Sequence, residues 1–124
     1  MGWARFWYAL AYAKWANRDM EAPFDQHMLV ALIAPRLVCI GSATEDDHAG
    51  PYGEYLTACH ASPVWERVYG LKGFVSDGFP APEAPQQDGD ISYHLRTGKH
   101  NLTPYDWNVY MDFADRHGWR KAAK

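Results

Sequence analysis

The sequence has few cysteines, no long apolar run and no cluster of basic residues. Its two cysteines in 124 residues are too few for the disulfide framework of a small secreted scaffold. None of its apolar stretches approaches the roughly 20 residues of a membrane-spanning helix. Lys and Arg number 12 against 15 Asp and Glu, for a net charge of −3. This balance argues against binding of nucleic acid or of an anionic membrane as the main task.

The remaining composition is that of a globular protein with many aromatic residues. Hydrophobic residues make up 48% and charged residues 22%, which argues against intrinsic disorder. A chain of this length buries about two-thirds of its unfolded surface, enough for one core. The aromatic share of 15% indicates a ring-rich core or, less often, a sugar-binding platform. Cys39 and Cys59 are expected to be buried free thiols.

The first fifteen residues allow two interpretations. One basic residue, Arg5, precedes an apolar run and the small-x-small sequence Ala11-Tyr12-Ala13, as in a secretory signal peptide. The run is at the lower length limit for such a signal, so we predict an amphipathic helix over 3–15 instead, with a cleaved signal as the alternative. The cellular location is not predicted.

Local patterns predict an α/β arrangement. Short apolar runs at 37–42 and 91–95 predict strands, the first buried on both faces. The predicted helices cover 26–33 after an Asp25 cap, 54–60, a separate segment from Pro63 to Tyr69, and a last helix beginning at Pro104. Glycines and prolines make 70–90 a long loop. Because almost fifty residues connect the two strands, they are expected to be parallel.

The last predicted helix has the clearest signals. Thr103 is its expected N-cap, followed by Pro104 and by Asp106 as the acid of a capping box. Its expected apolar face consists of Trp107, Tyr110, Met111, Phe113 and Ala114. Three tryptophans are expected in the core: Trp15, Trp65 and Trp107. Two parallel strands do not form an independent sheet, so we expect the chain to be part of a larger sheet, with an exposed edge open to self-association.

Chemically active side chains follow both strands. Ligands of open α/β sheets bind beyond the carboxyl ends of the strands. There the sequence places Asp46 and Asp47 after the first strand and His100 after the second. An acid followed by a histidine is the chain order of the last two members of a Ser, acid, His triad. Solvated loop acids and a capping histidine are the structural alternative.

Several motifs, in the same order, make the sequence resemble the C-terminal part of bacterial glucuronoyl esterases. They lie at 12–15, 23–27, 31–36, 42–48, 53–54, 61–64, 93–100 and 103–107. These proteins are serine carbohydrate esterases with an α/β-hydrolase fold, and they cleave the ester between 4-O-methylglucuronic acid on xylan and an alcohol of lignin. The resemblance implies one partial α/β-hydrolase domain over 1–124, with an atypical start at 1–11. Such esterases are usually secreted or periplasmic.

The resemblance also implies roles for individual residues. His100 corresponds to the catalytic histidine and Asp46 to its supporting carboxylate, with Asp47 as the alternative acid. His48 stands where these esterases commonly have a tryptophan beside the uronate. Lys99 is a candidate contact for the carboxyl group of the sugar. Independently of the resemblance, His94 and Arg96 lie two positions apart in a predicted strand and so point to one face, where we expect structural hydrogen bonds to a neighbouring loop.

The nucleophile of the family has no counterpart in this sequence. It lies in an upstream Gly-Cys-Ser-Arg-x-Gly turn, and none of the four serines here has such glycines: Ser42, Ser62, Ser76 and Ser92. We therefore predict a fragment of an esterase, inactive alone, whose N-terminal half is missing. No cofactor is expected, and the expected partner is glucuronoxylan or another uronate ester.

Two other functions are compatible with the residues. The chain can be a non-catalytic remnant whose aromatic side chains still bind carbohydrate or a partner. A metal site is the other alternative, because His and carboxylates are common zinc ligands. Its candidate ligands are Asp46, Asp47, His48 and His100.

Overall fold

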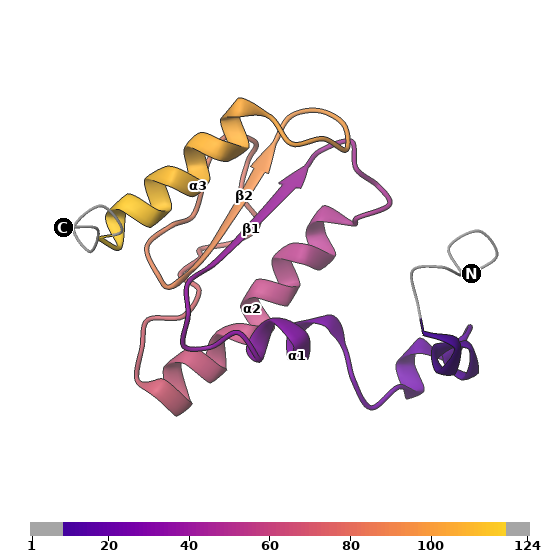
Figure 1. Ribbon diagram of the computed structural model, residues 1–124. Helices are drawn as coiled ribbons and strands as arrows, with labels where there is room; N and C mark the ends of the chain where they lie inside the picture. The colour runs from indigo at the N-terminus through magenta and orange to yellow at the C-terminus, as the bar shows by residue number, and fades with distance from the viewer. Residues whose placement is uncertain (1–8, 119–124) are drawn as a thin grey trace.

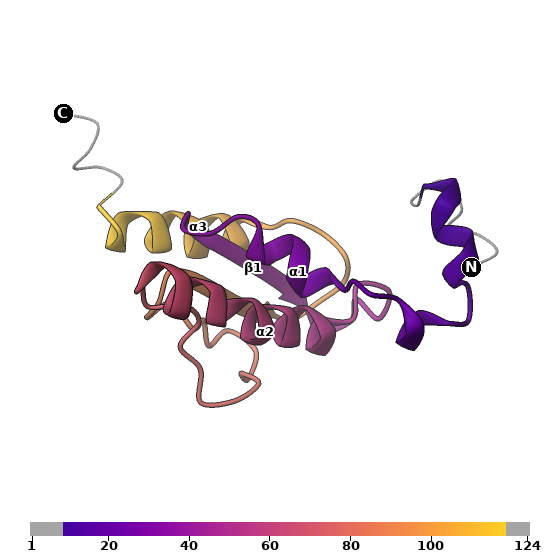
Figure 2. The same cartoon turned by 90° about the horizontal axis from the view of Figure 1, so that it is seen from below.

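The computed structural model describes residues 9–118 (Figure 1). Its regular elements, in chain order, are the 3-10 helices η2 (Leu10–Trp15) and η3 (Asp19–Glu21), then α1 (Gln26–Ala31), β1 (Val38–Ala43), α2 (Pro51–Tyr69), β2 (Ile91–Arg96) and α3 (Pro104–Arg116). Helices α2 and α3 lie on opposite faces of the sheet (Figure 2). No helix within the described range is long and apolar enough to cross a membrane.

The sheet consists of β1 and β2, which pair in parallel with Val38 opposite Ile91. The outer edge of β2 is covered by the long loop over 70–90, through isolated bridges from Phe74 to Ile91 and from Gln86 to Tyr93. Within residues 9–118, no strand pairs with the outer edge of β1. The predicted parallel pair with flanking helices is therefore confirmed, and the sheet is open on one side.

The core lies between α2 and β2. Trp65, Ile91 and Tyr93 are fully buried there. Their polar atoms are satisfied, since the Trp65 indole donates to the Arg36 carbonyl at 3.1 Å and the Tyr93 hydroxyl donates to the Pro51 carbonyl at 2.9 Å. Burying one such side chain contributes about 1.5–3 kcal/mol relative to leaving it exposed, so these three anchor the core.

The predicted break before Pro63 is wrong, because α2 continues through it. Proline inside a helix removes one backbone hydrogen bond and costs about 3 kcal/mol. Here the surrounding residues Ala61, Ser62 and Trp65 are all buried against the sheet and the long loop. The Ser62 hydroxyl also accepts from the Phe74 amide at 2.6 Å. We attribute the continuous helix to this packing, which local sequence signals do not contain.

The N-terminal helix differs from the prediction. Residues 1–8 lie outside the described part of the chain, so the proposed signal segment is only partly described. The first described element is the 3-10 helix η2, in which no residue is buried. Trp15 packs its ring edge-on against Phe24, with ring centroids 6.0 Å apart, and is half-buried rather than part of the core.

Strand β1 is more open than predicted. Val38, Ser42 and Ala43 are buried, but Cys39 and Gly41 between them are exposed. Cys59 is half-buried. The expectation of two buried thiols therefore fails for Cys39, because the sheet ends at β1 and leaves part of this strand uncovered.

Helix α3 presents a different face to the sheet than its hydrophobic pattern predicts. Its buried residues are Asp106, Val109 and Phe113, whereas Trp107 is 54% exposed. The predicted N-terminal capping box is confirmed, with the Asp106 carboxylate accepting from the Thr103 amide at 2.7 Å. Asp106 also binds side chains of β2, and these contacts turn its face of α3 inward.

Candidate active site

The loops that follow β1 and β2 meet at the arrowhead end of the sheet (Figure 1). The Thr44 amide donates to the Arg96 carbonyl and the Glu45 amide to the Gly98 carbonyl, both at 2.9 Å. In return the Gly98 amide donates to the Thr44 hydroxyl at 3.0 Å. Gly98 has a φ of 119°, which glycine adopts without strain. The loop that carries Asp46 and the loop that carries His100 are thus hydrogen-bonded to each other independently of any contact between these two side chains.

The structure brings His100 and Asp46 together. His100 Nδ1 and Asp46 Oδ2 are 2.5 Å apart, whereas the side chain of Asp47 is exposed. The hydrogen bond from His100 is the main cause that lowers the pKa of Asp46. An ionised carboxylate only accepts, so Nδ1 carries the proton and Nε2 of a neutral imidazole is left as an acceptor.

The two side chains differ in exposure. The His100 side chain is 87% exposed, while that of Asp46 is only 11% exposed. The Ala49 amide also lies 3.4 Å from Asp46 Oδ1. The pair is therefore a fixed carboxylate that orients an imidazole whose other nitrogen faces outward, and this arrangement can accept a proton from an incoming hydroxyl group.

A buried polar cluster lies beneath the loop that carries His100. His94 Nε2 and Asp106 Oδ1 are 2.8 Å apart, and Arg96 Nε donates to Asp106 Oδ2 at 2.8 Å. Burial alone raises the pKa of the Asp106 carboxyl, but the hydrogen bonds that it accepts outweigh burial and lower the pKa to about 2. Arg96 makes the expected hydrogen bonds to a loop, through the Thr97 and Lys99 carbonyls, whereas His94 binds Asp106 in α3 and not a loop. Asp106 was expected only as a helix cap.

Of the predicted substrate contacts, His48 and Lys99 are both exposed, one on each loop. Neither lines the cavity of about 140 Å³ that contains Asp46 and His100. Within residues 9–118 no group of three or more His, Cys, Asp or Glu side chains is arranged to hold a metal ion. The four candidate ligands of the metal alternative are therefore not arranged as a metal site.

Glu54, which begins the helix predicted over 54–60, is a further residue of the site. It lies in the first turn of α2 and accepts from the Ser42 hydroxyl at 2.6 Å. Burial raises the pKa of Glu54, and the hydrogen bond from Ser42 opposes that rise. In the sequence, Pro51 indicates a helix start, and a helix that starts there has Glu54 in its first turn, which faces the end of β1.

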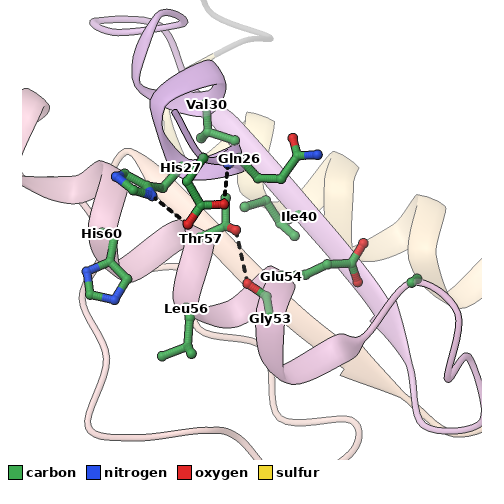
Figure 3. A pocket seen from close by; sticks show the side chains of 11 residues that line it. Gln26, His27, Val30, Ile40, Gly53, Glu54, Leu56, Thr57 and His60 are labelled. Atoms are coloured by element: carbon green, nitrogen blue, oxygen red, sulfur yellow. Dashed lines mark hydrogen bonds and ion pairs between the residues drawn. The ribbon is translucent and has the colours of Figure 1, made fainter. Parts of the chain in front are cut away.

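A second, larger cavity of about 600 Å³ lies among α1, α2 and β1 (Figure 3). Figure 3 shows His27 and His60 near each other on one side of it and Glu54 on the other. Glu54 and Ala49 line both cavities, so the larger cavity adjoins the one that contains His100.

Comparison with known proteins identifies relatives of this arrangement. No family profile matches the chain. Carbohydrate esterase MZ0003, from an unknown prokaryotic organism, is 44% identical over 111 residues, which cover 90% of this chain and 25% of the relative. Over its matched residues the chain is similar to this carbohydrate esterase. The resemblance inferred from the sequence motifs is confirmed.

Solved structures of CE15 esterases are also similar to this chain. A promiscuous CE15 esterase from a marine bacterial metagenome is 46% identical with a TM-score of 0.79, and the match covers 84% of this chain and 26% of that one. A glucuronoyl esterase from Solibacter usitatus is 45% identical with a TM-score of 0.77, over 84% of this chain and 26% of the other. One from Teredinibacter turnerae T7901 is 31% identical with a TM-score of 0.67, over 77% and 22%. The chain spans about a quarter of the length of these CE15 esterases.

Proposed function

We propose that this chain supplies the histidine and the acid of a serine carboxylic ester hydrolase of the glucuronoyl esterase type. The observation that carries the proposal is the hydrogen bond between His100 and Asp46 at the ends of adjacent parallel strands. The substrate class is a uronic acid ester, including those that link glucuronoxylan to lignin alcohols. The serine and the donors that stabilise the oxyanion come from a further polypeptide segment.

In this mechanism Asp46 holds the imidazole with Nε2 free to accept a proton. Nε2 takes the proton of the serine hydroxyl as its oxygen attacks the ester carbonyl. The imidazolium of His100, stabilised by Asp46, then gives that proton to the departing alcohol, which leaves a uronyl ester on the serine. Water, deprotonated by the same nitrogen, hydrolyses this ester and releases the uronic acid. His48 and Lys99, exposed on the two loops, are proposed hydrogen-bond donors to the sugar.

Three of the four serines have other hydrogen-bond partners, and the fourth, Ser92, is buried in β2 and does not line the cavity that contains His100. Ser42 lines the same cavity as His100, but its hydroxyl proton is donated to Glu54. Ser62 donates to Glu66 at 2.7 Å, and Ser76 donates to the Gly78 carbonyl at 3.0 Å. A serine whose proton is committed to a neighbouring carboxylate is not activated by the imidazole. This supports a nucleophile from outside the chain.

The proposal is tested with a benzyl ester of glucuronic acid. We expect no hydrolysis by the chain alone and hydrolysis by a protein in which the chain is preceded by the serine-bearing portion of a CE15 relative. In that protein His100→Ala should lower kcat by about 10⁶, as for removal of a triad histidine. The matched control, His60→Ala, changes an exposed histidine of α2 and should retain activity. Comparable hydrolysis by the bare chain, or an active His100→Ala variant, would contradict the proposal.

A non-catalytic carbohydrate-binding remnant is the second candidate. It is favoured by the exposed rings of Tyr52 and Phe79, whose centroids are 5.4 Å apart. Exposed rings of this kind can stack on sugar faces. Calorimetric titration with glucuronoxylan oligosaccharides tests this candidate. Binding that is lost in Tyr52→Ala and unchanged in His100→Ala would favour it over the esterase.

A further inference from the structure

The backbone on both sides of His100 is bound by one side chain. Arg96 Nη2 donates to the Lys99 carbonyl at 2.9 Å and to the Asn101 carbonyl. Arg96 Nη1 donates to the Thr97 carbonyl at 3.3 Å. The guanidinium therefore contacts the residue before His100, the residue after it and the start of the loop.

Arg96 is itself fixed from the opposite side. Its Nε donates to Asp106 Oδ2, and the same oxygen accepts from the Thr103 amide at 2.7 Å. The other oxygen of Asp106 is bound to His94. Arg96, Asp106 and His94 are all buried, so the guanidinium is held among β2, the loop and the first turn of α3.

The His100 side chain has no comparable support from packing, since it is 87% exposed. An exposed side chain meets Asp46 at 2.5 Å only if its backbone is placed correctly. The backbone carbonyls next to His100 are fixed by Arg96, and the amide and carbonyl of Gly98 are fixed by the loop after β1. The geometry of the His100–Asp46 pair is therefore determined by the groups that hold the backbone of the loop, including the buried side chain of Arg96.

We propose that Arg96, oriented by Asp106, is a positioning residue that holds His100 in contact with Asp46. Its importance for catalysis rests on the proposed function of His100 as the proton acceptor. The planar guanidinium presents five donors in a rigid fork, whereas a lysine ammonium is a compact charge with three rotatable donors. Arg96→Lys therefore keeps the charge and loses the fork.

The test follows the Asp46 carboxyl by NMR titration in the full chain. His100→Gln removes the group that lowers the Asp46 pKa, so the pKa should rise toward the ordinary value of about 3.9. Arg96→Met and Arg96→Lys should each give the same rise in the Asp46 pKa. In the double variant, Arg96→Lys should cause no rise beyond that of His100→Gln alone. The matched control is Arg116→Met, which removes an exposed arginine at the far end of α3 and should leave the Asp46 pKa unchanged.

An Arg96→Lys variant that folds and keeps the Asp46 pKa of the parent would overturn the proposal, as would full additivity with His100→Gln. If neither Arg96 variant folds, the test is instead the rate at which the arginine Nε protons of the parent protein exchange with water. We expect the buried Arg96 proton to exchange with water at least tenfold more slowly than that of Arg116, and equal rates would refute the inference. A serine-completed protein without esterase activity would refute the proposed function while leaving these measurements valid.

Discussion

The strongest consequence of the structure for stability concerns Asp106→Asn. The carboxylate is buried and binds both Arg96 and His94 at 2.8 Å. Replacing it with a neutral amide leaves the buried Arg96 without its counter-charge, and breaking a buried ion pair in this way costs about 3–5 kcal/mol. Because small domains are stable by about 5–15 kcal/mol, the substitution should remove a large part of the total.

Urea unfolding followed by the fluorescence of the chain measures this loss. The matched control is Asp112→Asn, an exposed acid on the same helix, which should change the free energy of unfolding by less than about 0.5 kcal/mol. A loss below about 1 kcal/mol for Asp106→Asn would show that the buried cluster contributes little to the stability of the fold.

The same carboxylate gives a pH dependence of known sign. The pKa of Asp106 is about 2 in the folded chain and about 3.9 in an unfolded one. A group whose pKa is lowered by folding contributes its stability fully above the unfolded value and loses it as the pH falls through the folded value. The parent should therefore lose stability between about pH 4 and pH 2, and Asp106→Asn should lack this component. An equal acid-induced loss in both proteins would refute the assignment.

Two further substitutions test contacts of the site and the open edge of the sheet. Ser42→Ala removes the hydrogen bond that opposes the effect of burial on Glu54, so the already raised pKa of Glu54 should rise further in a carboxyl NMR titration, and an unchanged value would contradict the contact. In the serine-completed protein the same variant should retain esterase activity, because Ser42 is not the nucleophile. Cys39→Lys places a charge on the exposed, unpaired side of β1, and should lower any self-association of the chain measured by sedimentation, since lysine on an edge strand opposes strand pairing.

The features predicted from sequence have signals that are local in the chain or follow from the order of the strands. The cap of α3 was predicted because Thr103, Pro104 and Asp106 carry the whole signal within four positions. An acid near His100 was predicted because parallel strands have their carboxyl ends at one edge of the sheet, and the resemblance to glucuronoyl esterases favoured Asp46 over Asp47. The roles of both residues, and those of His48 and Lys99, remain predictions for the enzymatic tests.

The errors arose where distant contacts oppose local preference. Pro63 signals a helix start, but buried neighbours on α2 keep the helix continuous. Trp107 belongs to the most apolar face of α3, yet the inward face is the one that carries Asp106. Hydrophobic periodicity cannot predict this rotation, because the buried partners of Asp106 are polar groups on β2.

The position of Asp106 connects these observations. One carboxylate caps α3, neutralises Arg96 and holds the guanidinium against the carbonyls beside His100. An exposed imidazole is thereby oriented by groups that are themselves shielded from water, where hydrogen bonds are stronger. Substitutions in this cluster should therefore affect stability and site geometry together. A loss of activity in such a variant is evidence for positioning only when it is measured well below the unfolding transition and accompanied by a change in the titration of Asp46.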